Sequence, residues 1–242
     1  MKKIIVKLKE LKKKDLAQAV KKIMAGMYDP SIFKSIFLAG GPGSGKSFVA
    51  RKTTLGHGLK LVNSDTMFEH LMNKAGMDLN MVGMTEEQVK KKDEIRKKAK
   101  EITEKMKQEY VNGRIGIVID GTGRDYSNIK LQKDALEELG YDTSMVFVNT
   151  SLDTALARNK MRKRSVPENL VKKFWKNVQG NMGKFQKLFG NTNFIIIDNN
   201  VPVEDKELFN NVWKDIKKFA KRPIKNYIAK LWIETEKTKK KK

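Results

Sequence analysis

The fold is decided by one stretch of the sequence, Gly40-Gly41-Pro42-Gly43-Ser44-Gly45-Lys46-Ser47. It matches G-x-x-x-x-G-K-[ST] in full, directly after the apolar run 35–39 and directly before 48–52, a plausible first turn of a helix. Glycines at these positions let backbone N–H groups converge on phosphate oxygens, and the helix start adds a positive dipole end. Lys46 is expected to reach the β and γ phosphates and Ser47 to ligate Mg²⁺. The stretch therefore predicts a site for a nucleoside triphosphate, with ATP and Mg²⁺ as the expected ligands.

Apolar runs that alternate with helical patterns surround this phosphate loop. We expect strands at 35–39, 59–63, 115–119, 144–149 and 194–197. The clearest helix opens with a capping box at Thr85-Glu86-Glu87-Gln88 and closes at Asn112-Gly113. Such alternation of strands and helices predicts an α/β fold, an open parallel sheet with helices on both faces.

Positive charge gathers at the two ends of the chain. Of the 242 residues, 51 are Lys or Arg and 28 are Asp or Glu, a formal net charge of +23. Solvated tails and weak attraction to a polyanion explain the lysine-rich ends equally well. We expect a basic helical N-terminal extension over 1–30, a central domain over 31–220, and a basic C-terminal helix with a lysine tail over 221–242.

The composition excludes several classes of protein. The chain has no Cys, which excludes a disulfide scaffold and a thiolate metal site. It has no apolar run approaching the roughly 20 residues of a membrane helix, and its basic start lacks the apolar segment of a signal peptide. We therefore expect a cytoplasmic protein without a membrane partner. His57 and His70 lack a partner cluster, so neither is assigned to a metal or to catalysis.

Polar residues follow the second and third expected strands, on the same edge of the sheet as the phosphate loop. Asp65 follows the second strand, where it could accept the proton of a hydroxyl that attacks the γ-phosphate. The alternative is that Asp65 caps the helix over 66–72. Asp120, Thr122 and Arg124 follow the third strand and could hold substrate or water, although a tight turn would also explain them.

Arg158 and Arg162 are four residues apart and share one face of an expected helix that starts near Leu152. This spacing suits a pair of cations that clamps phosphates from a lid over about 156–167. The guanine-reading motif Asn-Lys-x-Asp of GTPases does not occur in the chain.

In combination, these motifs resemble the P-loop kinase family that holds bacteriophage polynucleotide 5′-hydroxyl kinases and zeta toxins. The resemblance covers about residues 33–200. It implies an adenylate-kinase-like, five-stranded parallel sheet in the order 2-3-1-4-5. It also implies that Asp65 is the base, that Arg162 is the lid arginine on the transferred phosphate, and that Arg158 lies near the nucleotide. A phage-encoded member would work in the host cytoplasm.

The acceptor of the phosphate is less well determined than the family. Polynucleotide kinases of this type tend to carry Arg three positions after the base, where this chain has Phe68. Zeta toxins share the pattern of Ile119 to Arg124 and phosphorylate a sugar hydroxyl of UDP-N-acetylglucosamine. Three functions follow as hypotheses: a kinase of a nucleic acid or nucleotide, a zeta-toxin-like kinase, and a nucleic-acid-binding module whose phosphate loop drives a switch.

Overall fold

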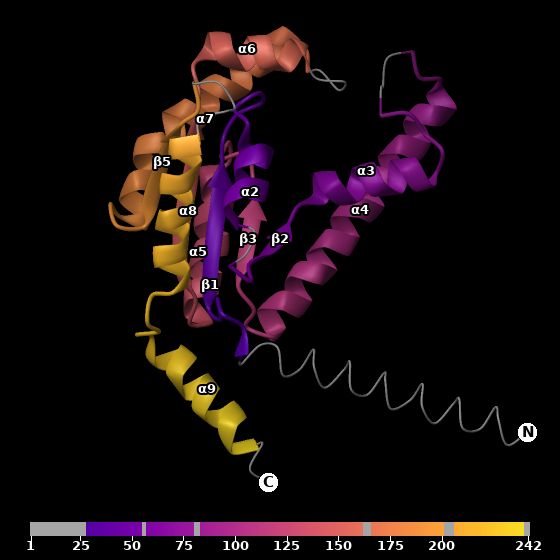
Figure 1. The fold of residues 1–242 in the computed structure, drawn as a ribbon. Helices are drawn as coiled ribbons and strands as arrows, with labels where there is room; N and C mark the ends of the chain where they lie inside the picture. Colours follow the sequence, from indigo (N-terminus) through magenta and orange to yellow (C-terminus); the bar gives the residue numbers. More distant parts are fainter. Residues whose placement is uncertain (1–27, 55–56, 80–82, 162–165, 201–205, 240–242) are drawn as a thin grey trace, which may run out of the picture.

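The structure, a computed structural model, describes residues 28–54, 57–79, 83–161, 166–200 and 206–239. In this part of the chain a five-stranded parallel sheet forms with the strand order β2-β3-β1-β4-β5 (Figure 1). In chain order the elements are β1 (Lys34–Ala39), α2 (Lys46–Thr54), β2 (Lys60–Val62), α3 (Ser64–Lys74), α4 (Glu86–Asn112), β3 (Ile117–Asp120), α5 (Tyr126–Glu138), β4 (Asp142–Asn149), α6 (Leu152–Lys160), α7 (Glu168–Phe189), β5 (Phe194–Asp198), α8 (Lys206–Ala220) and α9 (Tyr227–Lys239). The predicted fold class and strand order are confirmed.

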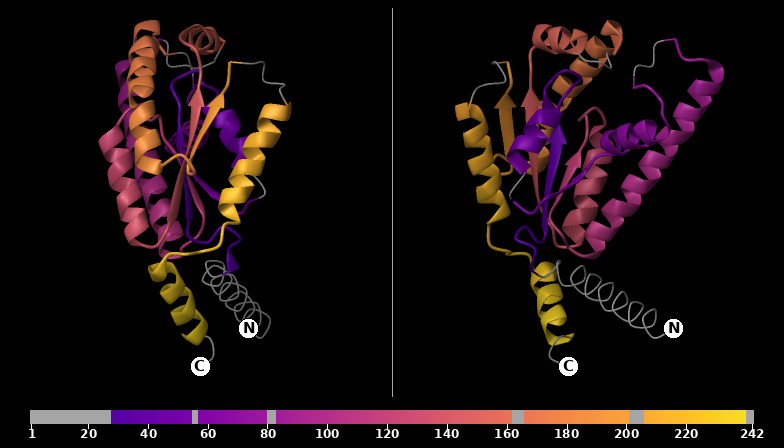
Figure 2. Two further views of the ribbon diagram at one scale, coloured as in Figure 1. Left: turned by 90° about the vertical axis from the view of Figure 1, so that its left-hand side faces the viewer. Right: turned by 45° about the vertical axis from the view of Figure 1, so that its right-hand side comes forward.

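Helices cover both faces of the sheet, as Figure 2 shows with α5 and α7 on one side and α2 and α8 on the other. Along β1, Phe37 packs into the cluster under α5 and α7, whereas Ile36 and Leu38 pack into the cluster under α2 and α8. Every residue of β1 is buried. A strand buried on both faces needs apolar side chains at consecutive positions, which explains the continuous apolar run before the phosphate loop.

Two strands are shorter than predicted, whereas the other three are one or two residues longer. β3 begins at Ile117 because Arg114, with a φ of 56°, turns the chain at the end of α4. The Ile115 amide then donates to the Tyr110 carbonyl at 3.0 Å, so Ile115 lies in the connection. β2 ends at Val62 because the next residue, Asn63, already caps α3.

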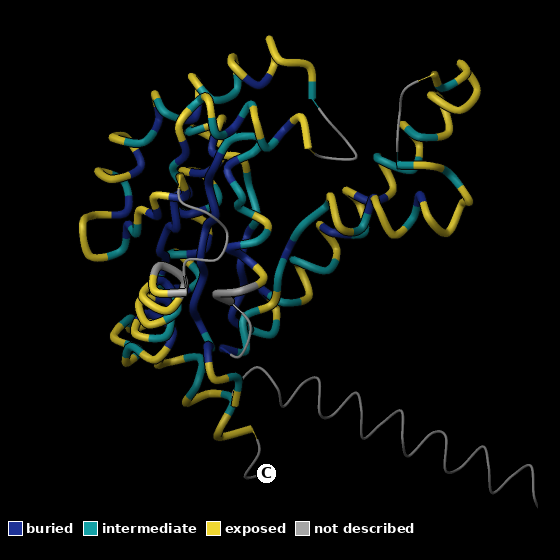
Figure 3. Tube along the Cα trace, turned by 45° about the horizontal axis from the view of Figure 1, so that its top comes forward, coloured by how far each residue is buried: buried dark blue, intermediate teal, exposed yellow. Residues whose placement is uncertain are grey.

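Helices α3 and α4 form a hairpin that projects away from the sheet (Figure 1). The capping box of α4 is confirmed, since the Thr85 hydroxyl accepts from the Gln88 amide at 3.2 Å and the Gln88 side chain accepts from the Thr85 amide at 2.9 Å. The seam of the hairpin buries Phe68, Met72 and Ala99. Figure 3 shows that buried residues follow the central strands, whereas most exposed ones lie on outer helix faces and on this hairpin.

The C-terminal helices α8 and α9 are separated by a short connection that contains Arg222 and Pro223. Although α9 falls in the expected basic extension, Ala229 is fully buried and the Trp232 ring meets the Phe33 ring at 5.5 Å. Nearly all of the expected N-terminal extension, and residues 240–242, lie outside the described residues. In the described part of the chain, no helix is long and apolar enough to cross a membrane.

Two glycines in the middle of α7 provide a test of the helix. A Cβ added to Gly180 or Gly183 would meet nothing within 4 Å, and both residues are exposed. Because glycine costs about 0.5–1 kcal/mol relative to alanine inside a helix, we expect Gly180→Ala to raise the free energy of unfolding by about that amount in urea titrations.

Gly190 is the matched control, since a Cβ there also meets nothing within 4 Å but the backbone has a φ of 73°. Its ψ of 157° puts Gly190 in a region of backbone conformation that essentially only glycine adopts, where alanine costs about 1–3 kcal/mol, so Gly190→Ala should destabilise the protein. Equal effects of the two substitutions would contradict this account of α7 and its end.

Candidate functional site

The phosphate loop joins β1 to α2 in a conformation that needs glycine. Gly43 and Gly45 have φ values of 76° and 80°. A Cβ on Gly43 would lie 2.3 Å from the Ala155 carbonyl oxygen, so the loop packs closely against α6. Side chains other than glycine are excluded at Gly43 both by backbone conformation and by space.

Residues that follow β4 and β5, together with a residue of α7, support the phosphate loop through hydrogen bonds. The Ser44 carbonyl accepts hydrogen bonds from the Asn199 amide at 2.7 Å and from the Thr150 hydroxyl at 3.3 Å. Trp175 of α7 in turn donates its ring N–H to the Thr150 carbonyl at 2.7 Å. The loop is therefore shaped by the ends of β4 and β5 and by α7 rather than by its own sequence alone.

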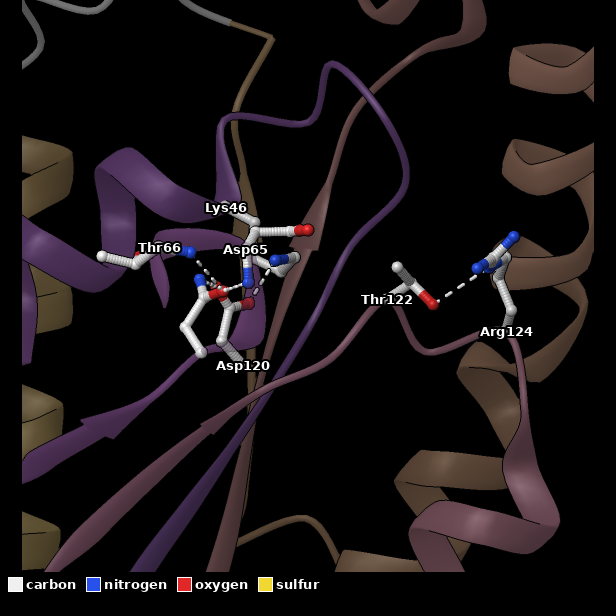
Figure 4. A network of polar contacts seen from close by, with 7 residues as sticks. Lys46, Asp65, Thr66, Asp120, Thr122 and Arg124 are labelled. Atoms are coloured by element: carbon white, nitrogen blue, oxygen red, sulfur yellow. Dashed lines mark hydrogen bonds and ion pairs between the residues drawn. The ribbon is translucent and has the colours of Figure 1, made fainter. Parts of the chain in front are cut away.

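Lys46, the first residue of α2, forms an ion pair with Asp120 at the end of β3 (Figure 4). β3 lies beside β1, so the end of β3 faces the phosphate loop. The Asp120 side chain is only 2% exposed, and its second oxygen accepts from the Asn63 amide at 2.5 Å. Both carboxylate oxygens therefore have partners, as a buried charge requires.

Asp65 lies in the first turn of α3, beside this ion pair (Figure 4). Asn63 caps the helix, because its side-chain oxygen accepts from the Asp65 and Thr66 amides at 2.7 and 3.3 Å. The alternative that Asp65 is the cap is therefore wrong. Its carboxylate is 57% exposed and accepts from Arg96 of α4 at 2.6 Å. A carboxylate held in this way at the carboxyl edge of the sheet is open to an incoming molecule.

Thr122 and Arg124 form a second pair, set apart from Lys46 and Asp120 and next to α7 (Figure 4). The Arg124 Nε donates to the Thr122 hydroxyl at 3.1 Å, and its guanidinium lies 4.1 Å from the centre of the Phe174 ring. The Thr122 carbonyl accepts from the Gly40 amide at 3.2 Å, which ties this turn to the phosphate loop. The sequence placed Asp120 and Arg124 in one group, whereas the structure separates them.

Arg158 of α6 lies beside the phosphate loop. It donates to the Asn199 carbonyl at 2.8 Å, and its guanidinium is 3.8 Å from where a Cβ of Gly45 would be. Arg162 and residues 163–165 of the expected lid lie outside the described residues.

The residues at this edge fit a magnesium–nucleotide complex. Ser47 is exposed in the first turn of α2, and the Asp120 carboxylate lies on the neighbouring strand end. Mg²⁺ takes oxygen ligands and is usually held by one or two protein groups together with water and substrate phosphates. Ser47 would hold the ion directly, with Asp120 as the nearby carboxylate.

Sequence reasoning missed Arg96 and the role of Asn63. Arg96 stacks over the Phe68 ring at 5.0 Å and pairs with Asp65. The available signal was that Arg96 is the one arginine among the lysines of 90–105, since arginine suits stacked and bidentate contacts better than lysine does.

The loop geometry predicts different outcomes at two of its glycines. Gly43→Ala should lower the affinity for Mg–ATP at least tenfold, because the new methyl group must displace the Ala155 backbone. At Gly41 the nearest atom to an added Cβ is the Trp175 Cα at 3.7 Å, an ordinary contact, so Gly41→Ala should change the affinity much less. Calorimetric titration with a non-hydrolysable ATP analogue and Mg²⁺ measures both, and similar losses would contradict the packing described for Gly43.

Known proteins share both the sequence pattern and the fold. A family model described as an AAA domain matches residues 36–184, whereas no curated protein matches the sequence. A proposed kinase from Chloroflexus aurantiacus has a TM-score of 0.51 at 11% identity, covering 77% of this chain and 97% of that one. The AvrRxo1-ORF1:AvrRxo1-ORF2 complex with sulphate ions gives 0.51 at 14% identity over 81% and 71%. A gluconokinase from Sinorhizobium meliloti gives 0.44 at 15% identity over 86% and 98%.

Identities this low show the fold alone. The family model spans more than half of the chain and includes the phosphate loop, Asp65, Asp120 and Arg158. The protein therefore has a P-loop kinase fold and belongs to the AAA domain family.

Proposed function

We propose that the protein is an ATP- and Mg²⁺-dependent phosphotransferase that moves the γ-phosphate to a hydroxyl of a nucleic acid or nucleotide. One observation carries the proposal. Asp65, whose carboxylate is 57% exposed, donates its backbone amide to Asn63, and Asn63, Asp120 and Lys46 continue this chain of contacts to the phosphate loop. A base and a phosphate-binding loop placed together at one edge are what transfer to a hydroxyl requires.

In the proposed reaction the phosphate loop amides and Lys46 hold the β and γ phosphates, and Arg158 adds positive charge beside the loop. The acceptor oxygen forms a bond to the γ-phosphorus while the bond to the bridging oxygen of ADP breaks, and the proton of the acceptor hydroxyl passes to Asp65. Mg²⁺, when bound, neutralises phosphate charge. Arg96 holds the Asp65 carboxylate, which is 57% exposed, at the edge where the acceptor hydroxyl would arrive.

Thr122 and Arg124 are proposed to bind the acceptor, since they are exposed and lie on the α7 side of the phosphate loop. Asp120 is proposed to position Lys46, because its partners are Lys46 and Asn63. Its expected contribution to acceptor binding is then indirect. Arg162 is proposed to supply positive charge to the transferred phosphate from the lid.

Asp65→Asn tests the base. The substitution keeps the shape of the side chain and removes the charge, so phosphate transfer should fall about 10²- to 10⁴-fold while affinity for Mg–ATP is kept. Glu69, an exposed carboxylate one turn further along α3, provides the control Glu69→Gln, which should stay within a few-fold of the parent. Transfer of label from γ-labelled ATP measures both. Parental turnover in Asp65→Asn would remove Asp65 from the role of base.

Arg162→Ala tests the lid. Arginines that stabilise a transferred phosphoryl group are worth about 10³ to 10⁵ in turnover, so turnover should fall by orders of magnitude. Lys160→Ala, at the last residue of α6 and two positions earlier in the sequence, should leave turnover within a few-fold. If the turnover of Arg162→Ala stays within a few-fold of the parent, as expected for Lys160→Ala, Arg162 does not stabilise the transferred phosphate.

A zeta-toxin-like kinase of UDP-N-acetylglucosamine is the second candidate, favoured by the match of Ile119 to Arg124 to the zeta-toxin pattern. This candidate would also use Asp65 as the base. The two candidate kinases therefore differ only in which acceptor receives label from γ-labelled ATP. A switch without an acceptor differs from both, because its nucleotide-dependent binding would survive Asp65→Asn.

A further inference from the structure

The surface where α7 meets the start of α5 carries cations and aromatic rings in alternation. We call it the α5–α7 seam and define it by Arg124, Tyr126, Lys173, Phe174, Asn177 and Lys184. The Arg124 guanidinium stacks on Phe174 at 4.1 Å, and the Lys184 ammonium lies 5.9 Å from the centre of the Tyr126 ring. Arg124 and Lys184 are exposed, and both rings are partly exposed.

The turn before α5 is fixed to α7 by buried polar contacts. The Asn181 side-chain amide donates to the carbonyls of Gly123 and Arg124 at 3.1 and 3.0 Å, and Asn181 itself is only 8% exposed. The Tyr126 ring packs against Phe185 at 5.6 Å. The rings and cations of the seam are therefore presented on a rigid support, which lowers the entropy cost of binding.

Charge on this side of α7 is of one sign. Lys173, Asn177 and Lys184 recur at spacings of four and seven, so they share the helix face that borders Tyr126. α7 has a single acid, Glu168, which pairs with Lys172 at the start of the helix. Within the described residues, neither Lys173, Lys184 nor Arg124 has an acidic side chain in ion-pair contact, and the adjacent Asp125 accepts the Asn128 amide as the cap of α5.

The seam is longer than a single nucleotide. From Lys173 to Lys184 the helix rises about 16 Å, whereas one strand of a nucleic acid duplex advances about 3.4 Å per nucleotide. At its Arg124 end the seam adjoins the phosphate loop, since the carbonyl of Thr122 accepts from Gly40. A nucleic acid that reaches both ends of the seam therefore needs a chain of several nucleotides, with one end of that chain near the carboxyl edge.

We propose that the α5–α7 seam binds a single-stranded polynucleotide and guides one end of it to the carboxyl edge. Lysines contact the phosphates, while Tyr126 and the Arg124–Phe174 stack receive unpaired bases, the combination of groups that single-strand binding surfaces use. The idea that this strand is the phosphate acceptor rests on the proposed function, whereas binding of the strand does not.

The test is fluorescence anisotropy of the full chain with 15-mers of oligo-dT and oligo-U, each with a free 5′-hydroxyl and a 3′ dye, between 50 and 200 mM salt. The double variant Lys173→Gln/Lys184→Gln should weaken binding at least fivefold and reduce the slope of log affinity against log salt by about 1.4, or about 0.7 per lost phosphate contact. Tyr126→Leu should weaken binding at least fivefold with little change in that slope, because stacking is lost rather than charge.

Lys97→Gln/Lys98→Gln on the exposed face of α4 is the control with the same change of charge, and it should weaken binding less than twofold. Equal losses in the two double variants would show that net charge alone governs binding and would overturn the proposal. Tighter binding of a duplex of the same length, with the same dependence on Lys173 and Lys184, would also overturn it.

The same variants separate this inference from the proposed function. Affinity for Mg–ATP should be unchanged in both double variants. If transfer occurs, Lys173→Gln/Lys184→Gln should raise KM for a 15-mer acceptor but not for a dinucleotide. If strand binding depends on the seam lysines but no acceptor is phosphorylated, the seam is supported as a binding surface and the proposed phosphotransfer is contradicted. If an acceptor is phosphorylated but neither binding nor KM depends on the seam lysines, phosphotransfer is supported and the seam proposal is contradicted.

Discussion

The rest of the structure depends on the ion pair between Lys46 and Asp120. The pair joins the phosphate loop after β1 to the end of β3, and Asp120 is almost wholly removed from water. A carboxylate in such a place must have partners for both oxygens, and Asn63 supplies the second contact. Because Asn63 also caps α3, one buried charge determines where β2 ends and where α3 begins, and the exposed Asp65 carboxylate lies in the first turn of that helix.

The two sides of the carboxyl edge differ in what they offer to a ligand. On the side of α3 and α4, Asp65 is held by Arg96, which itself rests on the buried Phe68 ring. On the side of α7, Arg124 stacks on the Phe174 ring and donates to the Thr122 hydroxyl, and no acidic side chain in the described part of the chain forms an ion pair with Arg124. Proton transfer and acceptor binding are thus proposed for opposite sides of the phosphate loop.

Local patterns predicted the fold well. The phosphate loop, the five strands and the capped helix α4 are each specified by adjacent residues, through backbone conformation, burial on both faces and side-chain caps. Contacts between distant segments were less predictable. Arg96 meets Asp65 across 31 residues and Asp120 meets Lys46 across 74, and no periodicity in the sequence encodes such pairs. The cap of α3 also depends on a distant residue. Either Asn63 or Asp65 has a side chain that can cap a helix, and Asn63 is held in place by its contact with the buried Asp120.

The central claim is that this edge transfers phosphate to a hydroxyl. It is tested most directly by incubating the full chain with γ-labelled ATP and Mg²⁺ and a panel of acceptors: 5′-hydroxyl single-stranded DNA and RNA, duplex DNA and UDP-N-acetylglucosamine. The account predicts label on a single-stranded polynucleotide. Label on the sugar nucleotide alone would assign the zeta-toxin-like activity instead, and hydrolysis of ATP with no labelled acceptor would contradict phosphotransfer altogether.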